Sequence, residues 1–203
     1  MRFDFRMLAR KYRMAIRGVI QVGAHHGQEY SVYRDLGVER LLFFEPLPEA
    51  FAVLRERVGP EVELVNKAVG AFSGAAEMFV ERANQGMSSS VLRPKAHLME
   101  YPGIVFDKQR LAVDMVRLDD YPLQRLFNLM VLDVQGYEFE VLKGAERTLC
   151  AIDYLVTEVN DAELYEGCAL ADQLNAHLTQ RGFTLVEVCW TAHHWGDALY
   201  VRH

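Results

Sequence analysis

The stretch Gly18-Val19-Ile20-Gln21-Val22-Gly23-Ala24-His25-His26-Gly27 decides the fold predicted for this chain. It begins as a short apolar run, typical of a buried strand, and its later glycines mark a sharp turn. A second apolar run, residues 40–44, ends at the carboxylate Glu45. Glycines let a ligand approach the backbone, and a carboxylate after the next strand can accept hydrogen bonds from two ribose hydroxyls. The pair therefore predicts a site for an adenosine-containing ligand.

Length and composition indicate one globular domain. The chain has 203 residues, of which 51% are hydrophobic and 25% charged. It contains no apolar run long enough to span a bilayer, and residues 1–6 lack the apolar stretch of a secretory signal. Three cysteines, Cys150, Cys168 and Cys189, are widely spaced and form no metal-binding or redox pair. We therefore expect reduced thiols, no membrane span and a cytoplasmic protein.

The charge is unevenly distributed along the chain. Residues 1–17 carry a net charge of +5, although the whole chain carries −6. The acidic remainder argues against nucleic acid as a partner. A basic segment can contact a phosphate-bearing substrate or a membrane surface. We favour the alternative, a solvated helix that packs through its apolar side chains, namely Phe3, Phe5, Leu8 and Tyr12.

Strands and helices alternate through the first third of the chain. Apolar runs at 18–22, 40–44 and 62–65 predict buried strands, and amphipathic patterns at 28–36 and from Pro48 to Val58 predict the helices between them. This alternation indicates a parallel sheet with right-handed crossovers. A short strand at 77–81 and an irregular stretch at 82–110 then interrupt the pattern.

Regular structure is predicted again after residue 110. We expect an edge strand at 111–118, a buried strand at 129–132, a helix at 137–149, a strand from 154 that ends at Glu158, a helix around 170–178, and strands at 183–190 and 198–202. The last connection is too short for a helical crossover, so the final pair must be antiparallel. The prediction is an α/β, doubly wound, seven-stranded and mostly parallel sheet with a C-terminal antiparallel hairpin. Its domain would cover 18–203, after a basic segment at 1–17, with an irregular insertion around 82–110.

Three carboxylates are predicted at one edge of this sheet. Glu45, Asp133 and Glu158 each follow an apolar strand, and ligands of open parallel sheets bind beyond the carboxyl ends of the strands. One such acid would be explained as a helix cap or an ion-pair partner, but three beside a glycine turn favour a site. Asp133, Glu158 and Asn160 would also offer oxygen ligands to magnesium. We favour a site that binds no metal.

The order of motifs along the chain narrows the prediction. The glycine spacing lacks the GxGxxG pattern of NAD-binding sheets. The chain instead contains, in order, Val22-Gly23-Ala24-x-x-Gly27, Phe44-Glu45-Pro46, Asn84-Gln85-Gly86-Met87-Ser88-Ser89-Ser90, Leu118-Asp119-Asp120, Leu132-Asp133-Val134-Gln135-Gly136-Tyr137-Glu138 and Val141-Leu142-Lys143-Gly144-Ala145. Together these motifs resemble the FkbM-type family of class I S-adenosylmethionine-dependent methyltransferases. The resemblance runs from about Val19 to the C-terminus, and the string from Asp133 to Ala145 is its most specific part.

The resemblance implies S-adenosyl-L-methionine as cofactor and assigns residues to it. The turn from Gly23 through Ala24 to Gly27 would pass under the methionine part, and Glu45 would hold the ribose hydroxyls. Asn66 and Ala68 would lie near the adenine, and Asp133 near the methionine end and the acceptor. Gln21 stands where class I methyltransferases usually carry an acid. An amide can form hydrogen bonds but cannot attract an ammonium group by charge.

The resemblance also implies O-methylation of a sugar or natural-product hydroxyl, so the partner would be a small-molecule or glycan acceptor. An alcohol is a poor nucleophile, and a base within hydrogen-bond reach is expected. The candidate catalytic residues are Asp133, Glu158, Asn160 and His25. Ser88, Ser89, Ser90 and Trp195 are predicted to bind the substrate. His97, His193 and His194 fall in predicted loops, where we expect them to be exposed.

Two other functions are considered. A degenerate methyltransferase fold could serve as a non-catalytic binding module, which Gln21 favours and the intact Glu45 and Asp133 oppose. An NAD-dependent oxidoreductase is disfavoured by the glycine spacing and by the number of strands. The acceptor atom and the oligomeric state stay open at this point.

Overall fold

A seven-stranded sheet forms the centre of the molecule. The computed structural model describes residues 1–123 and 126–202. The strands are β1 (Gly18–Val22), β2 (Arg40–Phe44), β3 (Val62–Val65), β7 (Leu129–Leu132), β8 (Tyr154–Asn160), β9 (Phe183–Trp190) and β10 (Trp195–Arg202), in the order β3-β2-β1-β7-β8-β10-β9. Neighbours from β3 to β8 are parallel, and β10 is antiparallel to both β8 and β9. The predicted fold class and C-terminal hairpin are therefore confirmed.

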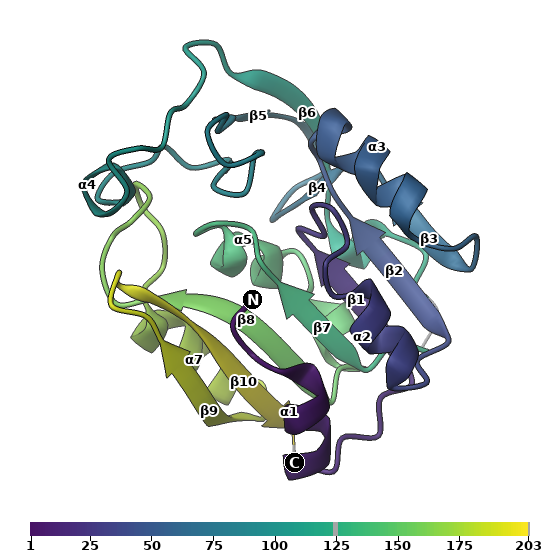
Figure 1. Ribbon diagram of the computed structural model, residues 1–203. Helices are drawn as coiled ribbons and strands as arrows, with labels where there is room; N and C mark the ends of the chain where they lie inside the picture. The colour runs from purple at the N-terminus through teal and green to yellow at the C-terminus, as the bar shows by residue number, and fades with distance from the viewer. Residues whose placement is uncertain (124–125, 203) are drawn as a thin grey trace.

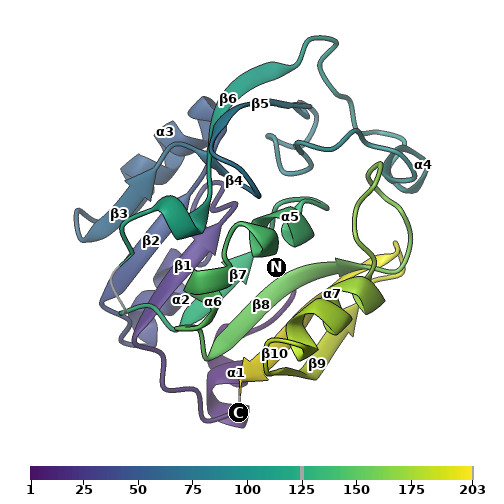
Figure 2. The same ribbon diagram turned by 180° about the vertical axis from the view of Figure 1, so that it is seen from behind.

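Helices cover both faces of this sheet (Figures 1 and 2). One face packs against α1 (Phe5–Lys11), α2 (Tyr30–Asp35) and α3 (Pro48–Arg57), and the other against α5 (Glu138–Lys143), α6 (Glu146–Leu149) and α7 (Ala171–Thr179). Leu8, Tyr33 and Leu54 are fully buried on the first face. A strand buried on both sides must be apolar throughout, which explains the continuous apolar runs in the sequence.

The helix predicted at 137–149 is divided into two. α5 ends at Lys143 and α6 begins at Glu146. A Cβ atom on Gly144 would lie only 1.9 Å from the carbonyl oxygen of Gly70. The chain at Gly144 therefore packs directly on the backbone of another segment, and its carbonyl accepts a hydrogen bond from the amide of Asp119. Tertiary packing interrupts the helix that the apolar periodicity predicted as continuous.

A separate three-stranded sheet lies beside the main one. It contains β4 (Ala68–Val69), β6 (Leu111–Val116) and β5 (Gly74–Met78), in the order β4-β6-β5. The prediction of an edge strand at 111–118 was wrong, because β6 is the middle strand of this sheet. The strand predicted at 77–81 begins earlier, at Gly74. Local patterns show that a strand is half buried but not which partners cover its edges.

The segment 82–110 is an arch between β5 and β6 (Figure 1). It holds the short helix α4 (His97–Glu100) and three isolated bridges, Phe79↔Ser90, Glu81↔Phe106 and Pro94↔Tyr165. A 3₁₀ turn at Leu118–Asp120 follows β6. The arch is irregular, as predicted, but the bridges fix it to the rest of the domain.

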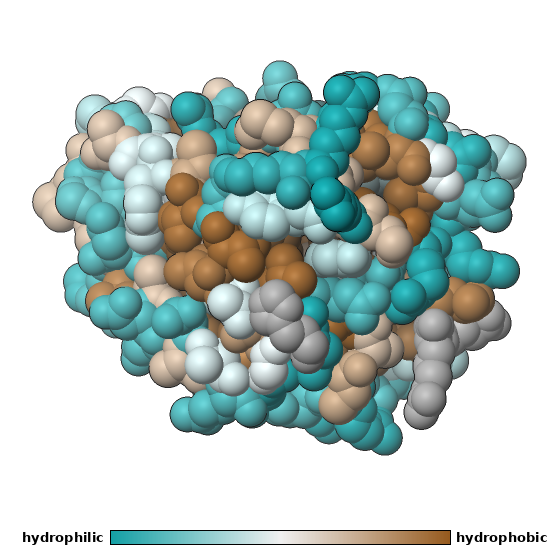
Figure 3. All heavy atoms as spheres, turned by 90° about the horizontal axis from the view of Figure 1, so that it is seen from below, coloured by the Kyte–Doolittle hydropathy of each residue, from teal (hydrophilic) through white to brown (hydrophobic). Residues whose placement is uncertain are grey.

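The N-terminal segment packs on the sheet. Asp4 caps α1 by accepting hydrogen bonds from the amides of Arg6 and Met7, and Phe5 and Leu8 are buried beneath the helix. Figure 3 views this end of the molecule from below, and its hydrophobic residues gather near the middle, bordered by hydrophilic ones. Among residues 1–123 and 126–202, no helix combines the length and apolar character that a membrane span requires.

Candidate active site

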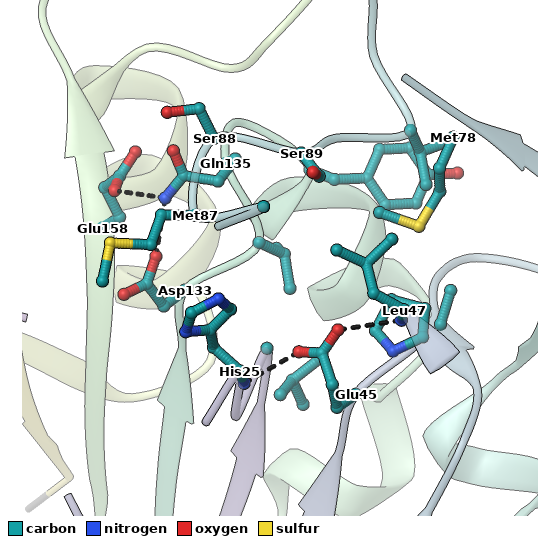
Figure 4. Close-up of a pocket in the computed structure, with 18 of the residues that line it drawn as sticks. His25, Glu45, Leu47, Met78, Met87, Ser88, Ser89, Asp133, Gln135 and Glu158 are labelled. Carbon is teal, nitrogen blue, oxygen red and sulfur yellow. Dashed lines mark hydrogen bonds between the residues drawn. The ribbon is translucent and has the colours of Figure 1, made fainter. Parts of the chain in front are cut away.

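A cavity of about 500 Å³ lies beyond the carboxyl ends of β1, β2, β7 and β8. The arch and the start of β10 supply its other walls, through residues such as Ser88, His97 and Trp195. Figure 4 shows Glu45 on one side of this cavity, Asp133, Gln135 and Glu158 on the other, and His25 between them. The three predicted carboxylates therefore line one cavity.

The glycine turn joins the ends of three strands. The amides of Gly23 and Ala24 both donate to the carbonyl of Phe44 at 3.0 Å. Gly23 has φ +79°, and a Cβ atom there would lie 1.9 Å from the carbonyl oxygen of Asp133. Gly23 lines the cavity, whereas Ala24 and Gly27 lie behind it. Close packing against β7 thus requires glycine at 23, in addition to any approach of a ligand.

Glu45 is a buried acceptor held by the backbone. Its side chain is 4% exposed and accepts hydrogen bonds from the amides of His25 (2.8 Å) and Leu47 (2.9 Å) (Figure 4). Burial raises the pKa of this carboxyl to about 7, although the two backbone hydrogen bonds oppose the rise. A carboxylate offers about four acceptor positions. Two remain available on Glu45 for a ligand.

Asn66 and Gln21 act through neighbouring residues. Asn66 Nδ2 donates to the carbonyls of Glu45 (2.8 Å) and Pro46 (3.1 Å) and so fixes the end of β2. Neither Asn66 nor Gln21 lines the cavity, but Ala68 does. Gln21 Nε2 donates to Glu29 Oε2 at 2.9 Å, and Glu29 is a cavity residue. Glu29, to which sequence reasoning assigned no role, therefore places a carboxylate at the cavity wall beside Gln21.

Asp133 and Glu158 are bridged by one amide. Gln135 Nε2 lies 2.7 Å from Asp133 Oδ1 and 3.1 Å from Glu158 Oε2 (Figure 4). Glu158 is 5% exposed; burial raises its pKa well above the ordinary value, and the nearby Asp133 raises it further. The amino group of Met1 lies 3.5 Å from Asp133 Oδ2 and 4.0 Å from Glu29 Oε1. This part of the cavity therefore attracts a cation.

The three serines differ in position. Ser88 and Ser89 line the cavity, and Ser90 does not. Ser89 Oγ accepts a hydrogen bond from the amide of Glu81 (2.9 Å), and Ser90 Oγ donates to the carbonyl of Gln135 (2.7 Å). Two of the three hydroxyls thus fix the arch and the turn after β7.

Neither His25 nor Asn160, both predicted as catalytic candidates, presents a free polar group to the cavity. The ring of His25 accepts a hydrogen bond from Gln28 Nε2 (2.9 Å) and donates through Nε2 to the carbonyl of Gln85 (2.8 Å), so both nitrogens are engaged. Asn160 is fully buried in β8 and does not line the cavity. Within the described part of the chain, neither polar atom of its side chain has a hydrogen-bond partner.

Aromatic side chains line the far end of the cavity. Trp195 Nε1 donates to the hydroxyl of Tyr101 at 2.7 Å, and the ring of His97 lies 4.9 Å from that of Tyr101 and 5.2 Å from that of Tyr165. The expected exposure of His97 was wrong, because α4 packs onto Tyr165 and leaves the ring 5% exposed. His193 and His194 are exposed, as expected.

The comparisons with known proteins agree with this geometry. The model of the methyltransferase FkbM domain family matches residues 21–185, most of the chain. The chain belongs to this family. The predicted resemblance is confirmed.

Individual relatives define how far the likeness extends. The 2-O-methyltransferase NoeI of Sinorhizobium fredii is 32% identical over 160 residues, which cover 73% of this chain and 65% of that protein. The N-methyltransferase NodS of Bradyrhizobium japonicum, solved with S-adenosylhomocysteine, has a TM-score of 0.55 at 13% identity over 97% of this chain and 84% of its own. A putative S-adenosylmethionine-dependent methyltransferase of Listeria monocytogenes has a TM-score of 0.58 at 8% identity, over 92% and 91%. The last two show a shared fold.

Proposed function

We propose that this protein is an S-adenosylmethionine-dependent O-methyltransferase that acts on a hydroxyl of a sugar or another small molecule. The observation that carries the proposal is the buried Glu45, held beside the glycine turn with two acceptor positions left over. Membership of the FkbM family supports methyl transfer, and the 2-O-methyltransferase NoeI supports oxygen as the acceptor atom.

The cavity residues fit this cofactor. The free acceptor positions of Glu45 suit two ribose hydroxyls, and such charge-assisted hydrogen bonds contribute about 1.5–3 kcal/mol each. Glu29 and Asp133, which here face the amino group of Met1, would accept the ammonium group of the methionine part in its place. Leu47, Val69 and Met78 line the cavity and would offer apolar contacts to the adenine. When bound, S-adenosylmethionine supplies an electrophilic methyl group and becomes S-adenosylhomocysteine once its S–CH₃ bond breaks.

The acceptor would bind at the aromatic end of the cavity. Trp195 and Tyr101 offer flat apolar surfaces against which a sugar ring can pack, and Ser88 offers a hydroxyl. Glu158 or Asp133 would take the proton of the acceptor hydroxyl while its oxygen bonds to the methyl group. The raised pKa makes the ionised form of Glu158 a stronger base than an exposed carboxylate, and it also lowers the fraction of Glu158 that is ionised.

A binding experiment tests the cofactor half of this proposal. Calorimetry with S-adenosylhomocysteine should show binding to the wild type and none to a folded Glu45→Ala variant. Glu56→Ala, an exposed position on α3, is the matched control and should bind as the wild type does. Wild-type affinity in folded Glu45→Ala would refute the role of Glu45. Stabilisation by NAD instead of S-adenosylhomocysteine would favour an oxidoreductase.

A second experiment tests catalysis. Mass spectrometry of small molecules and glycans, with and without the protein, should reveal a product heavier by one CH₂ group. Cofactor binding without any such product would favour a non-catalytic binding module. We also propose a cytoplasmic location, since Cys150, Cys168 and Cys189 are free thiols.

Metal independence belongs to the same proposal. The protein's own residues supply both a cation site for the methionine end and candidate bases, so transfer should need no metal. Exhaustive chelation should leave the rate of product formation unchanged. A loss of activity that magnesium restores would contradict this expectation.

A further inference from the structure

The backbone at Gln135 adopts a conformation that a non-glycine residue rarely takes. Its φ is +54°, in the left-handed region, and it is followed by Gly136 at φ +91°. Such a conformation costs free energy and persists only where surrounding contacts enforce it. An unfavourable backbone at a cavity residue calls for an explanation in what its side chain does.

Three hydrogen bonds enforce this conformation from different elements. The buried carboxylate of Glu138, on α5, accepts from the amides of Val134 (3.1 Å) and Gly136 (3.2 Å) through Oε1. On the opposite side, Ser90 of the arch donates its hydroxyl to the carbonyl of Gln135 at 2.7 Å. Two of these hydrogen bonds fix the peptide group that follows Gln135, through its carbonyl and the Gly136 amide, and the third fixes the amide of Val134 just before it.

Both N–H donors of the side-chain amide that this backbone presents are engaged. Its amide nitrogen bridges Asp133 Oδ1 and Glu158 Oε2, and its carbonyl oxygen lies 3.3 Å from the hydroxyl of Tyr165. Tyr165 is itself buried and donates to the carbonyl of Ser88 at 2.9 Å. A single amide thus connects two carboxylates from neighbouring strands with the wall of the cavity (Figure 4).

We propose that Gln135 is a positioning residue, whose amide holds the carboxylates of Asp133 and Glu158 in a fixed relation at the edge of the cavity. Ionisation of both carboxyl groups would place two like charges at adjacent strand ends, and a donor shared between them offsets that repulsion. What the two carboxylates do rests on the proposed function. The bridge that Gln135 forms between them, called the clamp below, is a property of the protein alone.

Several charged groups face Glu158 and contribute to its titration. They come from every element packed around it: Asp133 after β7, Glu138 on α5, Asp197 on β10, and the amino group of Met1. Gln135 is the neighbour whose side chain donates to the Glu158 carboxylate within the described residues. Loss of that donor should disfavour the ionised form of Glu158.

The chain offers a matched control for the test. Gln85 is the same residue type at nearly the same backbone angle, φ +56°, but it is exposed. Gln135→Gly and Gln85→Gly each remove a glutamine side chain and relieve a left-handed conformation. Gln85→Gly should therefore keep or raise the midpoint of thermal unfolding, whereas in Gln135→Gly the lost hydrogen bonds to Asp133 and Glu158 oppose this gain.

The titration of Glu158, followed by ¹³C NMR of labelled carboxyl groups in the whole protein, separates the two variants. The midpoint should move upward by about one pH unit in Gln135→Gly and stay unchanged in Gln85→Gly. Gln135→Asn keeps an amide on a shorter side chain, so its Glu158 midpoint should lie between those of the wild type and Gln135→Gly. Overlapping curves for Gln135→Gly and the wild type, or an equal shift in Gln85→Gly, would overturn the proposal.

This experiment needs neither acceptor nor cofactor. Calorimetry with S-adenosylhomocysteine on the same samples reports separately on the proposed function. A shifted titration in a protein that fails to bind S-adenosylhomocysteine would support the clamp and count against the methyltransferase assignment. An unshifted titration in a protein that binds S-adenosylhomocysteine would count against the clamp and support the methyltransferase assignment.

Discussion

At the scale of single residues, Gly23 shows that one glycine can serve both the fold and a ligand. Its position after the first strand suggested only the approach of a ligand to the backbone. The structure adds a contact with the backbone of Asp133 that leaves no room for a Cβ atom. Two demands therefore coincide at this residue, namely a left-handed φ and close packing between β1 and β7.

These demands can be separated by comparison with Gly37. Gly37 has φ +76°, close to the +79° of Gly23, but nothing lies within 4 Å of its added Cβ. We expect Gly37→Ala to lower the free energy of unfolding by about 1 kcal/mol, the cost of the left-handed conformation. Gly23→Ala adds a steric clash and should cost about 3 kcal/mol or more. Urea unfolding measures both; equal losses would show that packing at Gly23 is unimportant.

Which site residues the sequence can predict depends on how they reach the cavity. Glu45, Asp133 and Glu158 follow apolar strands, and parallel strands bring their carboxyl ends to one edge, so these residues could be placed together. The burial of His97 and the contacts of Gln135 could not be predicted in this way, although Gln135 follows the same strand as Asp133. Their positions depend on contacts with Tyr165 and Ser90, which are distant in sequence and leave no periodic pattern.

At the scale of elements, the strands were easier to predict than their connections. Buried strands such as β1 and β7 carry continuous apolar runs, and their bounds agree with the structure. The break between α5 and α6 depends on Gly70, from another part of the chain. The place of β6 in a second sheet depends on which strands pair with it. Neither is a property of the local sequence.

The arch and the β9–β10 hairpin form one wall of the cavity through the hydrogen bond between Trp195 and Tyr101. His193, close to Trp195 in the hairpin, also connects the two elements, since its Nδ1 lies 3.1 Å from Oε2 of Glu100 on α4. Tyr101→Phe and Trp195→Phe each remove one partner of the Trp195–Tyr101 hydrogen bond and keep a ring. In a double-mutant cycle we expect a coupling of about 1 kcal/mol in the free energy of unfolding.

The same cycle bears on acceptor binding. Neither variant touches Glu45 or Glu29, so the affinity for S-adenosylhomocysteine should stay as in the wild type. The KM for an acceptor, once known, should rise. Strictly additive stability losses together with an unchanged KM would show that the two elements act independently.

At the scale of the whole molecule, one edge of the sheet concentrates buried acids that oppose stability. Burial raises the pKa of both Glu45 and Glu138 to about 7, and raises that of Glu158 as well. Acids away from the cavity, such as Glu61 and Glu163, have lowered pKa values, because they accept hydrogen bonds from Tyr30 and Lys95. The destabilising acids therefore gather where the cavity is, as expected when residues are retained for binding or catalysis.

Glu138 allows a direct test of this cost. In the folded protein its pKa is about 7, above the ordinary value of 4.5. Between these two pH values Glu138 is protonated in the native state and ionised in the unfolded state. The native state therefore loses stability as the pH rises through about 7. In the Glu138→Gln variant, the side-chain amide oxygen would be able to accept the same two backbone hydrogen bonds without a charge. The difference in unfolding free energy, Glu138→Gln minus wild type, should therefore increase from about pH 5 to about pH 8, by at most about 3 kcal/mol. His97 and His177, whose pKa values are lowered by desolvation and act in the opposite direction, cancel in this difference. The control Glu56→Gln, exposed on α3, should give a difference in unfolding free energy that does not change with pH. If the difference for Glu138→Gln is also independent of pH, the charge of Glu138 does not destabilise the native state.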